Sequence, residues 1–226
     1  MTDQVKCFDL TYPDSLFKGP LVYGSPTWRK QFPPAREGEG NDYEVVSCPE
    51  FPDHRRTGLR RGPLKIVLPR RTSDFTWTWQ SDCIITERVA ALFSTAGLTG
   101  FDVQPIVFDT SVGPTLSGAD GHRLLELVAL GATVAAPESG IREVYHCRHC
   151  ELRVYSSYRK GIQVRQDDWD GSDFFTVRGY PKIRLVTERV KKVIVENRLT
   201  NCVLIRADEM IWSKYLSKPE DTYALG

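Results

Sequence analysis

Two stretches of the chain repeat one order of hydrophobic and polar positions, 101 residues apart. In the first, residues 74–79 alternate aromatic and polar side chains, Ile84 and Ile85 follow, and Thr-Glu-Arg-Val occupies residues 86–89. In the second, Leu185 and Val186 precede the same tetrapeptide at residues 187–190. This repetition predicts two copies of one strand-helix-strand unit.

The ends of the first predicted helix can be read from single residues. Thr86 is a suitable N-cap, and the carboxylate of Glu87 favours the positive end of the helix dipole. Gly97 is suited to a left-handed C-cap, with Leu98 packing back against the helix. The apolar face between these ends is Val89, Leu92, Phe93 and Ala96, and residues 101–108 are predicted to form the next strand.

The remaining pattern divides the chain into three parts. Residues 1–72 form a Pro- and Gly-rich N-terminal segment with short strands, one of them at residues 43–46. Residues 73–143 hold the first unit, and residues 144–226 hold a Cys-x-x-Cys segment and the second unit. Residues 124–130 are predicted to form a short helix, and residues 210–216 a last amphipathic turn. We expect an α+β fold with few helices and a pseudo-duplicated sheet, mixed or antiparallel.

Composition narrows the functional classes. The 226 residues carry a formal net charge of +1, so no overall field favours nucleic acid or an anionic membrane. The basic stretch at residues 55–71 could bind phosphate, but a solvated loop around one strand explains it more simply. The acidic N-terminus lacks a signal-peptide pattern, and no apolar run reaches the length of a membrane span. We therefore expect a cytoplasmic protein.

Cysteine spacing suggests one candidate metal site. Cys147 and Cys150 form a Cys-x-x-Cys pair, whose thiolates can reach one zinc ion at about 2.3 Å. No second pair exists, because the position three residues after Cys48 holds a phenylalanine. Cys48, Cys147 and Cys150 could still bind structural zinc with His54, His146 or His149 as the fourth ligand. The alternative is a metal-free turn, since a chain of this length does not require a metal to fold.

An acidic cluster precedes the second unit. It does not match a calcium-binding loop, because its glycine is in the wrong place. It could be a solvated turn, or a protein-binding patch with a central tryptophan. The candidate partner-binding residues are Asp167, Asp168, Trp169, Asp170 and Asp173.

Motifs that carry catalysis are missing from the sequence. It has no phosphate-binding loop, no dinucleotide-binding glycine pattern and no nucleophile elbow, and its four histidines show no catalytic spacing. We expect a protein that is not an enzyme.

Several short motifs, in their order along residues 43–208, resemble the myxobacterial double-CXXCG motif family. They are Ile84-Ile85-Thr86-Glu87-Arg88-Val89, Leu98-Thr99-Gly100-Phe101, Cys147-Arg148-His149-Cys150 and Trp169-Asp170-Gly171-Ser172-Asp173-Phe174. The resemblance implies an immunity protein that binds and neutralises a cognate bacterial toxin. This sequence departs from the family at Cys48, which lacks its partner cysteine, and at Glu151, which replaces the glycine. The alternative is a zinc-ribbon-like nucleic-acid-binding protein.

Overall fold

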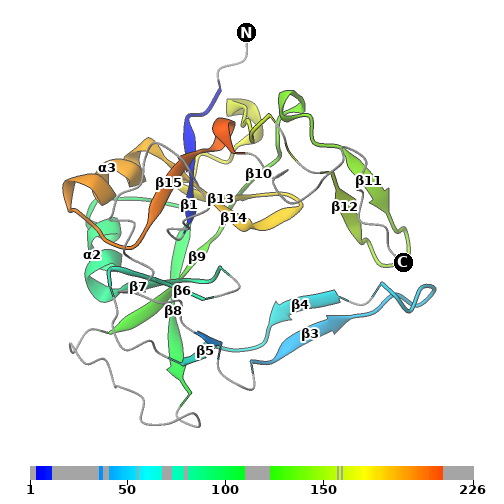
Figure 1. Ribbon diagram of the computed structural model, residues 1–226, viewed down its shortest axis with the longest axis horizontal. Coiled ribbons are helices and arrows are strands. Elements are labelled where there is room, and N and C mark those ends of the chain that lie inside the picture. The colour runs from blue at the N-terminus through cyan, green and yellow to red at the C-terminus, as the bar shows by residue number, and fades with distance from the viewer. Residues whose placement is uncertain are drawn as a thin grey trace.

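The computed structural model describes residues 4–11, 36–37, 41–54, 56–67, 73–78, 81–109, 123–156, 158 and 160–210. Within these ranges it contains two α-helices, α2 (Glu87–Thr95) and α3 (Glu188–Glu196), and is otherwise mostly sheet (Figure 1). The expected α+β class with few helices is therefore confirmed. Except for Met210, the predicted turn at residues 210–216 lies outside the described residues, as does half of the N-terminal segment of residues 1–72.

Two mixed sheets form the body of the molecule. The six-stranded sheet has the order β2 (Arg36–Glu37), β5 (Leu64–Val67), β8 (Phe101–Phe108), β9 (Leu124–Ala129), β7 (Cys83–Thr86) and β6 (Phe75–Trp77). The five-stranded sheet has the order β10 (Gly131–Thr133), β13 (Phe174–Val177), β14 (Tyr180–Thr187), β1 (Cys7–Thr11) and β15 (Val203–Arg206). The pairs β5–β8 and β10–β13 are parallel and the others are antiparallel. The described residues also form three short 3-10 helices, η1 (Pro137–Ser139), η2 (Gln166–Asp168) and η3 (Ala207–Glu209).

Helix α2 begins and ends where its sequence predicts. The Thr86 side chain accepts a hydrogen bond from the backbone N–H of Val89, which satisfies one of the free donors of the first turn. Gly97 has φ +62°, and Leu98 donates its N–H to the carbonyl of Phe93 at 3.1 Å. On the predicted apolar face Val89 and Phe93 are buried, while Ala96 is exposed.

The prediction of a helix at residues 124–130 is wrong. These residues form strand β9, which lies between β7 and β8 and pairs antiparallel with both. Leu124, Leu125, Glu126 and Leu127 are all buried, and so the leucine-rich run carries no exposed polar face. Ladder hydrogen bonds on both sides and burial on both faces outweigh the helix propensity of leucine, alanine and glutamate.

The two predicted units have matching strand arrangements. The first unit is β6, β7, α2 and β8, and the second unit is β13, β14, α3 and β15. In each, the first two strands pair antiparallel, and the strands before and after the helix are separated by one inserted strand. The inserted strand is β9 in the first unit, and in the second it is β1 from the N-terminal end of the chain. The N-terminal strand thus completes the C-terminal sheet.

Asp173 of the second unit binds the first unit. Its carboxylate accepts a hydrogen bond from the backbone N–H of Thr99 at 3.0 Å, just beyond the end of α2. Within its own unit, it accepts the hydroxyl of Thr187 at 2.6 Å and pairs with Arg189 at 2.7 Å. Arg189 continues to the carbonyl of Gly97 at 3.0 Å, at the negative end of α2.

Asp74 makes the reciprocal contact from the first unit. It accepts the backbone N–H of Thr200 at 2.9 Å and its hydroxyl at 2.8 Å, just beyond the end of α3. Arg88 pairs with Asp74 at 2.7 Å and donates to the carbonyl of Asn197 at the end of α3. The arginines of the two Thr-Glu-Arg-Val motifs therefore reach across to the opposite helix, a role that local pattern does not predict.

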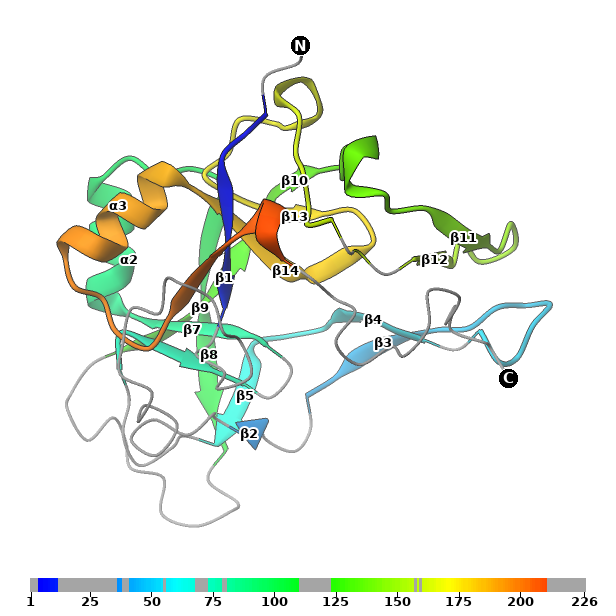
Figure 2. The same ribbon diagram turned by 45° about the horizontal axis from the view of Figure 1, so that its top comes forward.

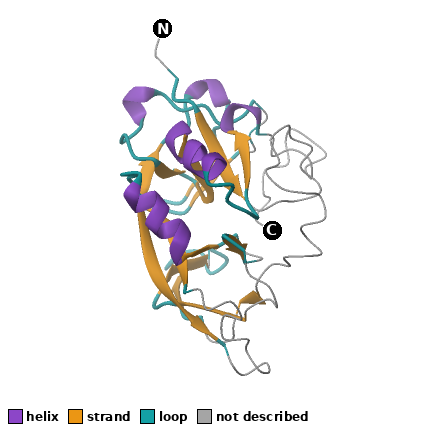
Figure 3. Ribbon diagram, turned by 90° about the vertical axis from the view of Figure 1, so that its left-hand side faces the viewer, coloured by secondary structure: helices purple, strands orange, loops and turns teal. Residues whose placement is uncertain are grey.

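One core fills the space between the units. It contains Phe75 and Phe93 from the first unit and Phe174 and Val190 from the second, together with Phe8 from β1. Phe93 and Phe174 lie with their ring centroids 5.2 Å apart, so the units are joined by direct aromatic packing. Figure 3 looks onto α2 and α3, which lie next to each other with the strands behind them.

Substitution of Asp173 by alanine tests the exchanged contacts. The Asp173 side chain is only 3% exposed, so its loss leaves the Thr99 N–H and the Thr187 hydroxyl without their acceptor. We expect the free energy of unfolding to fall by about 2–4 kcal/mol in urea titrations. Asp102→Ala, at an exposed position on β8, is the control and should change it by less than about 0.5 kcal/mol. Equal small effects at both positions would show that the contacts contribute little.

The buried carboxyl group of Asp9 should make the free energy of unfolding depend on pH. Burial raises the pKa of this β1 carboxyl to about 7, against the opposing effect of Arg184. The folded state then binds more protons than the unfolded state between about pH 4 and 7, so stability falls as pH rises through this window. Asp9→Asn removes the penalty of the buried charge and should be more stable than the parent above pH 7, by up to about 4 kcal/mol. Urea unfolding at pH 4 and pH 8 should show this advantage only at pH 8, whereas an equal difference at both would exclude the ionisation.

Candidate metal centre

Two antiparallel hairpins extend from the body on the same side of the molecule (Figures 1 and 2). The first arm is β3 (Tyr43–Val46) and β4 (Arg56–Arg60), which leads into β5 of the six-stranded sheet. The second arm is β11 (Glu143–His146) and β12 (Arg153–Tyr155), which lies between β10 and β13 of the five-stranded sheet in sequence. The strand prediction at residues 43–46 is confirmed. Each arm carries two metal-ligating side chains in the loop that joins its strands.

Cys48 and His54 of the first arm meet Cys147 and Cys150 of the second. All four ligand atoms lie within 4.8 Å of one another. The Sγ atoms of Cys48 and Cys147 are 3.8 Å apart, and Sγ of Cys150 is 3.9 Å from Nδ1 of His54. A tetrahedral ion with metal–sulfur bonds of about 2.3 Å places its sulfurs about 3.8 Å apart, so the geometry and the donor set fit zinc.

The two loops hold their first cysteine in the same way. Sγ of Cys48 accepts the backbone N–H groups of the residues two and three positions later, Glu50 and Phe51. Sγ of Cys147 accepts the corresponding groups of His149 and Cys150. Burial opposes ionisation of Cys147, but these hydrogen bonds and one with His54 lower its pKa to about 6. Thiolate is the form that binds a metal.

Of the three candidate histidines, only His54 joins the cysteines. His146 pairs with Glu151 at 2.9 Å, and the ring of His149 packs on Phe51 with centroids 6.0 Å apart. His54 reaches the site because its N–H donates to the carbonyl of Phe51 at 3.0 Å, closing a turn with a proline at its second position. Its other ring nitrogen, Nε2, lies 3.3 Å from the hydroxyl of Tyr145.

Tyr145 therefore supports the site from outside the ligand shell. Burial and the neighbouring thiols of Cys147, Cys150 and Cys48 raise its pKa, so the hydroxyl keeps its proton. If His54 binds a metal through Nδ1, its Nε2–H donates to the hydroxyl oxygen of Tyr145, and such a hydrogen bond fixes the orientation of the ring. The sequence pattern does not single out Tyr145, although its place two residues before Cys147 puts it on the strand that leads to this cysteine.

Glu151 occupies a position that normally calls for glycine. It follows Cys150 and has φ +55°, in the left-handed region that side chains with a Cβ seldom adopt. Its carboxylate pairs with His146 and with Arg153 at 3.3 Å, which ties the turn to both strands of the second arm. The departure from glycine in the sequence thus falls at a residue whose backbone keeps the glycine-like conformation.

The predicted partner-binding residues divide into an exposed pair and an internally bonded group. Asp167 and Asp168 are exposed on η2. The ring of Trp169 packs on Phe175, and its indole N–H donates to the Ser172 carbonyl at 3.0 Å. Asp170 accepts the N–H groups of Ala132 and Ser172, and Asp173 is buried between the units. Partner binding by this loop stays a prediction.

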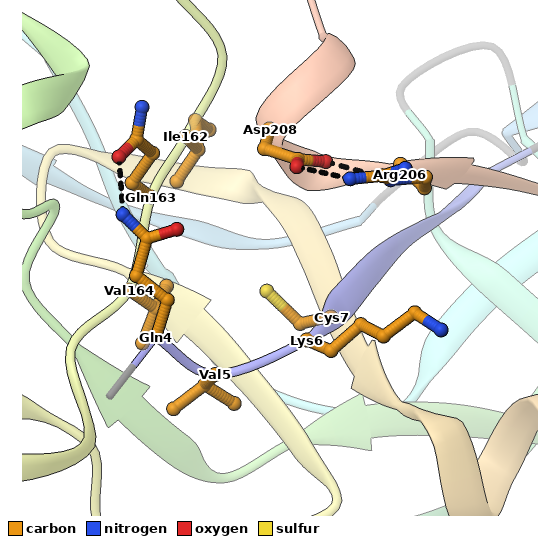
Figure 4. Close-up of a pocket in the computed structure, with 9 residues that line it drawn as sticks. All are labelled: Gln4, Val5, Lys6, Cys7, Ile162, Gln163, Val164, Arg206 and Asp208. Atoms are coloured by element: carbon orange, nitrogen blue, oxygen red, sulfur yellow. Dashed lines mark hydrogen bonds and ion pairs between the residues drawn. The ribbon is translucent and has the colours of Figure 1, made fainter.

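A cavity of about 180 Å³ lies beside the start of β1, away from the metal-ligating residues (Figure 4). Its polar side chains are paired among themselves or with neighbours: Gln4 with Gln163, Arg206 with Asp208, and Lys6 with Glu188. Burial and the charge of Asp208 raise the pKa of Cys7 to about 12, so its thiol is not a nucleophile near neutral pH.

Comparison with known proteins adds no relative. No family model and no curated protein matches this chain. Among the described residues, no helix is long and apolar enough to cross a membrane. The resemblance to the double-CXXCG family therefore stays a proposal that rests on the residues themselves.

Replacing Tyr145 by phenylalanine tests its support of His54. The change removes the hydroxyl that faces Nε2 but keeps the ring, so we expect zinc affinity to fall about tenfold in competition with a chromophoric chelator. The visible spectrum of the cobalt-substituted protein should shift as well, because the histidine ligand reorients. Tyr155→Phe, on the same arm but packed on Tyr180, is the control and should leave both unchanged. Unaltered affinity and spectrum in Tyr145→Phe would exclude this role.

Proposed function

We propose that this protein is an immunity protein, which binds a cognate bacterial toxin in the cytoplasm and neutralises it without catalysis. The observation that carries the proposal is the meeting of Cys48 with Cys147 and Cys150. These cysteines occupy the positions of the two family motifs, 99 residues apart between Cys48 and Cys147, and a shared ligand site is a reason for both motifs to exist. The glycine-like backbone of Glu151 supports the same resemblance.

The cofactor that we propose is one structural zinc ion, bound by Cys48, His54, Cys147 and Cys150. Four protein ligands close a tetrahedral site and leave no position for substrate or activated water. Zinc would therefore contribute cross-linking and not catalysis, holding the first arm to the second. This closed donor set supports a binding protein over an enzyme.

The surface of the arms suits a protein partner. Of the large apolar side chains that are exposed in the described ranges, four belong to the arms: Val45, Phe51, Leu59 and Val144. Val45, which pairs with Thr57 in the ladder, is 55% exposed, and Leu59 on the paired strand is 77% exposed. Exposed apolar side chains that lie near one another are typical of protein interfaces.

Nucleic-acid binding is the alternative, and the two metal-ligating hairpins are the observation that favours it, since zinc ribbons have this form. The charges on the arms do not favour nucleic-acid binding. Arg61 lies near Glu44, and Arg153 pairs with Glu143 and Glu151, so the described surface carries both signs. Phosphate recognition needs a basic excess and a steep salt dependence.

We also propose that the two units descend from one duplicated element. The reciprocal contacts of Asp74 and Asp173 and the matching strand order support this origin. In the first unit β9 follows β8 in the chain, whereas the equivalent neighbour of β15 is β1. A duplication followed by relocation of one strand to the N-terminus would account for the difference.

Co-expression with the toxin encoded by the neighbouring gene tests the function. We expect growth rescue and a co-purifying complex of equal stoichiometry. Val45→Thr combined with Leu59→Thr should weaken the complex at least tenfold while zinc content and unfolding stay unchanged, because both side chains are exposed. Val195→Thr, at an exposed site on α3, is the matched control. Absence of both rescue and complex would contradict the proposal, and retention on DNA or RNA that falls steeply with salt would support the alternative.

A further inference from the structure

The four metal-ligating residues differ in their exposure. Cys48, His54 and Cys147 are buried, with 7%, 7% and 3% of their surface exposed, whereas Cys150 is half-buried. The remaining cysteines, Cys7, Cys83 and Cys202, are buried in the body of the molecule. A small oxidant that reaches the folded protein from solvent therefore meets Cys150 first.

We propose that the metal centre is an oxidant-sensitive clasp, in which peroxide attacks Cys150, expels the zinc ion and releases the first arm from the second. This inference rests on the proposed zinc site, not on the toxin. It differs from a catalytic dithiol, because the thiols are consumed once per release and are restored by a reductant.

The chemistry balances with hydrogen peroxide as the oxidant. The Cys150 sulfur attacks one peroxide oxygen, the O–O bond breaks, and hydroxide leaves and takes a proton, which gives a sulfenic acid and water. A second thiolate then attacks the Cys150 sulfur, an S–S bond forms, and the departing hydroxide becomes a second water. Two thiolates lose two electrons in all, and peroxide gains them. The disulfide no longer supplies thiolate ligands, so the zinc ion leaves.

Cys147 is the second thiolate that the geometry favours. It lies three residues before Cys150 in the same turn, and the two sulfurs are within 4.8 Å of each other. Cys48 lies within the same distance and is held by backbone N–H groups just as Cys147 is, but it belongs to the other arm and not to the turn of Cys150. Which cysteine reacts with Cys150 decides whether the arms separate. A Cys147–Cys150 disulfide stays inside the second arm, whereas a Cys48–Cys150 disulfide would hold the two arms together.

Release matters because, among the described residues, few contacts other than the ligand atoms hold the tip of the first arm. A two-stranded hairpin is marginal in water without a packed face. Between the tip and the second arm the described contacts, apart from the ligand atoms themselves, are the Phe51 and His149 rings and the His54 and Tyr145 pair. At its base, Arg60 still pairs with the buried Glu126 of β9, so release should free the tip while the base stays attached.

The experiment uses the full chain, with zinc content measured before oxidant is added. On titration with hydrogen peroxide we expect one zinc per chain to be released, as read by a zinc-sensitive dye, together with a Cys147–Cys150 disulfide in peptide mass mapping. Hydrogen exchange should rise at least tenfold in residues 47–54 and stay unchanged in α2 and α3. Thiol reductant with zinc should reverse all three changes.

Cys150→His is the matched variant, since it keeps four ligands but removes the exposed thiol. Its zinc release by peroxide should be at least tenfold slower. If this variant does not bind zinc, timed alkylation of the parent protein tests the proposal instead. It measures the order in which the thiols are oxidised, and the proposal requires that Cys150 is oxidised first. Three results would overturn the proposed clasp. They are a disulfide between Cys150 and Cys48, retention of zinc while other thiols are oxidised, and loss of zinc without faster hydrogen exchange in residues 47–54. A parent chain that binds no zinc would overturn the metal site itself, whatever the result with the toxin.

Discussion

The carboxylates of Asp74 and Asp173 each bind the backbone just beyond the helix of the opposite unit, and the rest of the fold depends on this exchange. A backbone N–H at that place has no partner within its own helix, so the carboxylate of the opposite unit satisfies a donor that the helix leaves free. Each unit is thus completed by the other, and the aromatic core forms where the two meet.

The proposed zinc site ties the molecule at the other end. In Figure 1 the helices lie on one side of the sheets and the arms extend from the opposite side. The exchanged carboxylates fix how the two sheets face each other, and that relation brings two arms from different sheets within reach of one ion. A tetrahedral site tolerates errors of only a few tenths of an ångström in its ligand distances. The rigid pairing of the units is therefore a condition for a site whose ligands come from distant segments.

Local signals in the sequence predict the parts of this structure that depend on local chemistry. Thr86 and Gly97 fix the ends of α2, because a hydroxyl acceptor and a left-handed residue act within one turn. The placement of β9 and β1 depends instead on which strands flank them, and no periodicity encodes that. The position of His54, and not His146 or His149, beside the cysteines is likewise not encoded locally. It follows from the packing of two arms that lie about a hundred residues apart in the sequence.

In the first arm, Phe51 places His54 beside the cysteines. Phe51 stands where the second cysteine of the pair would be, yet its N–H still donates to Cys48, so the backbone of the loop is kept. Its carbonyl accepts the N–H of His54, and its ring packs on the His54 ring with centroids 5.0 Å apart. The residue that cannot bind metal thus positions the one that can. His54 thus brings a ring nitrogen within 4.8 Å of the sulfurs of Cys48, Cys147 and Cys150, which together form a Cys₃His donor set.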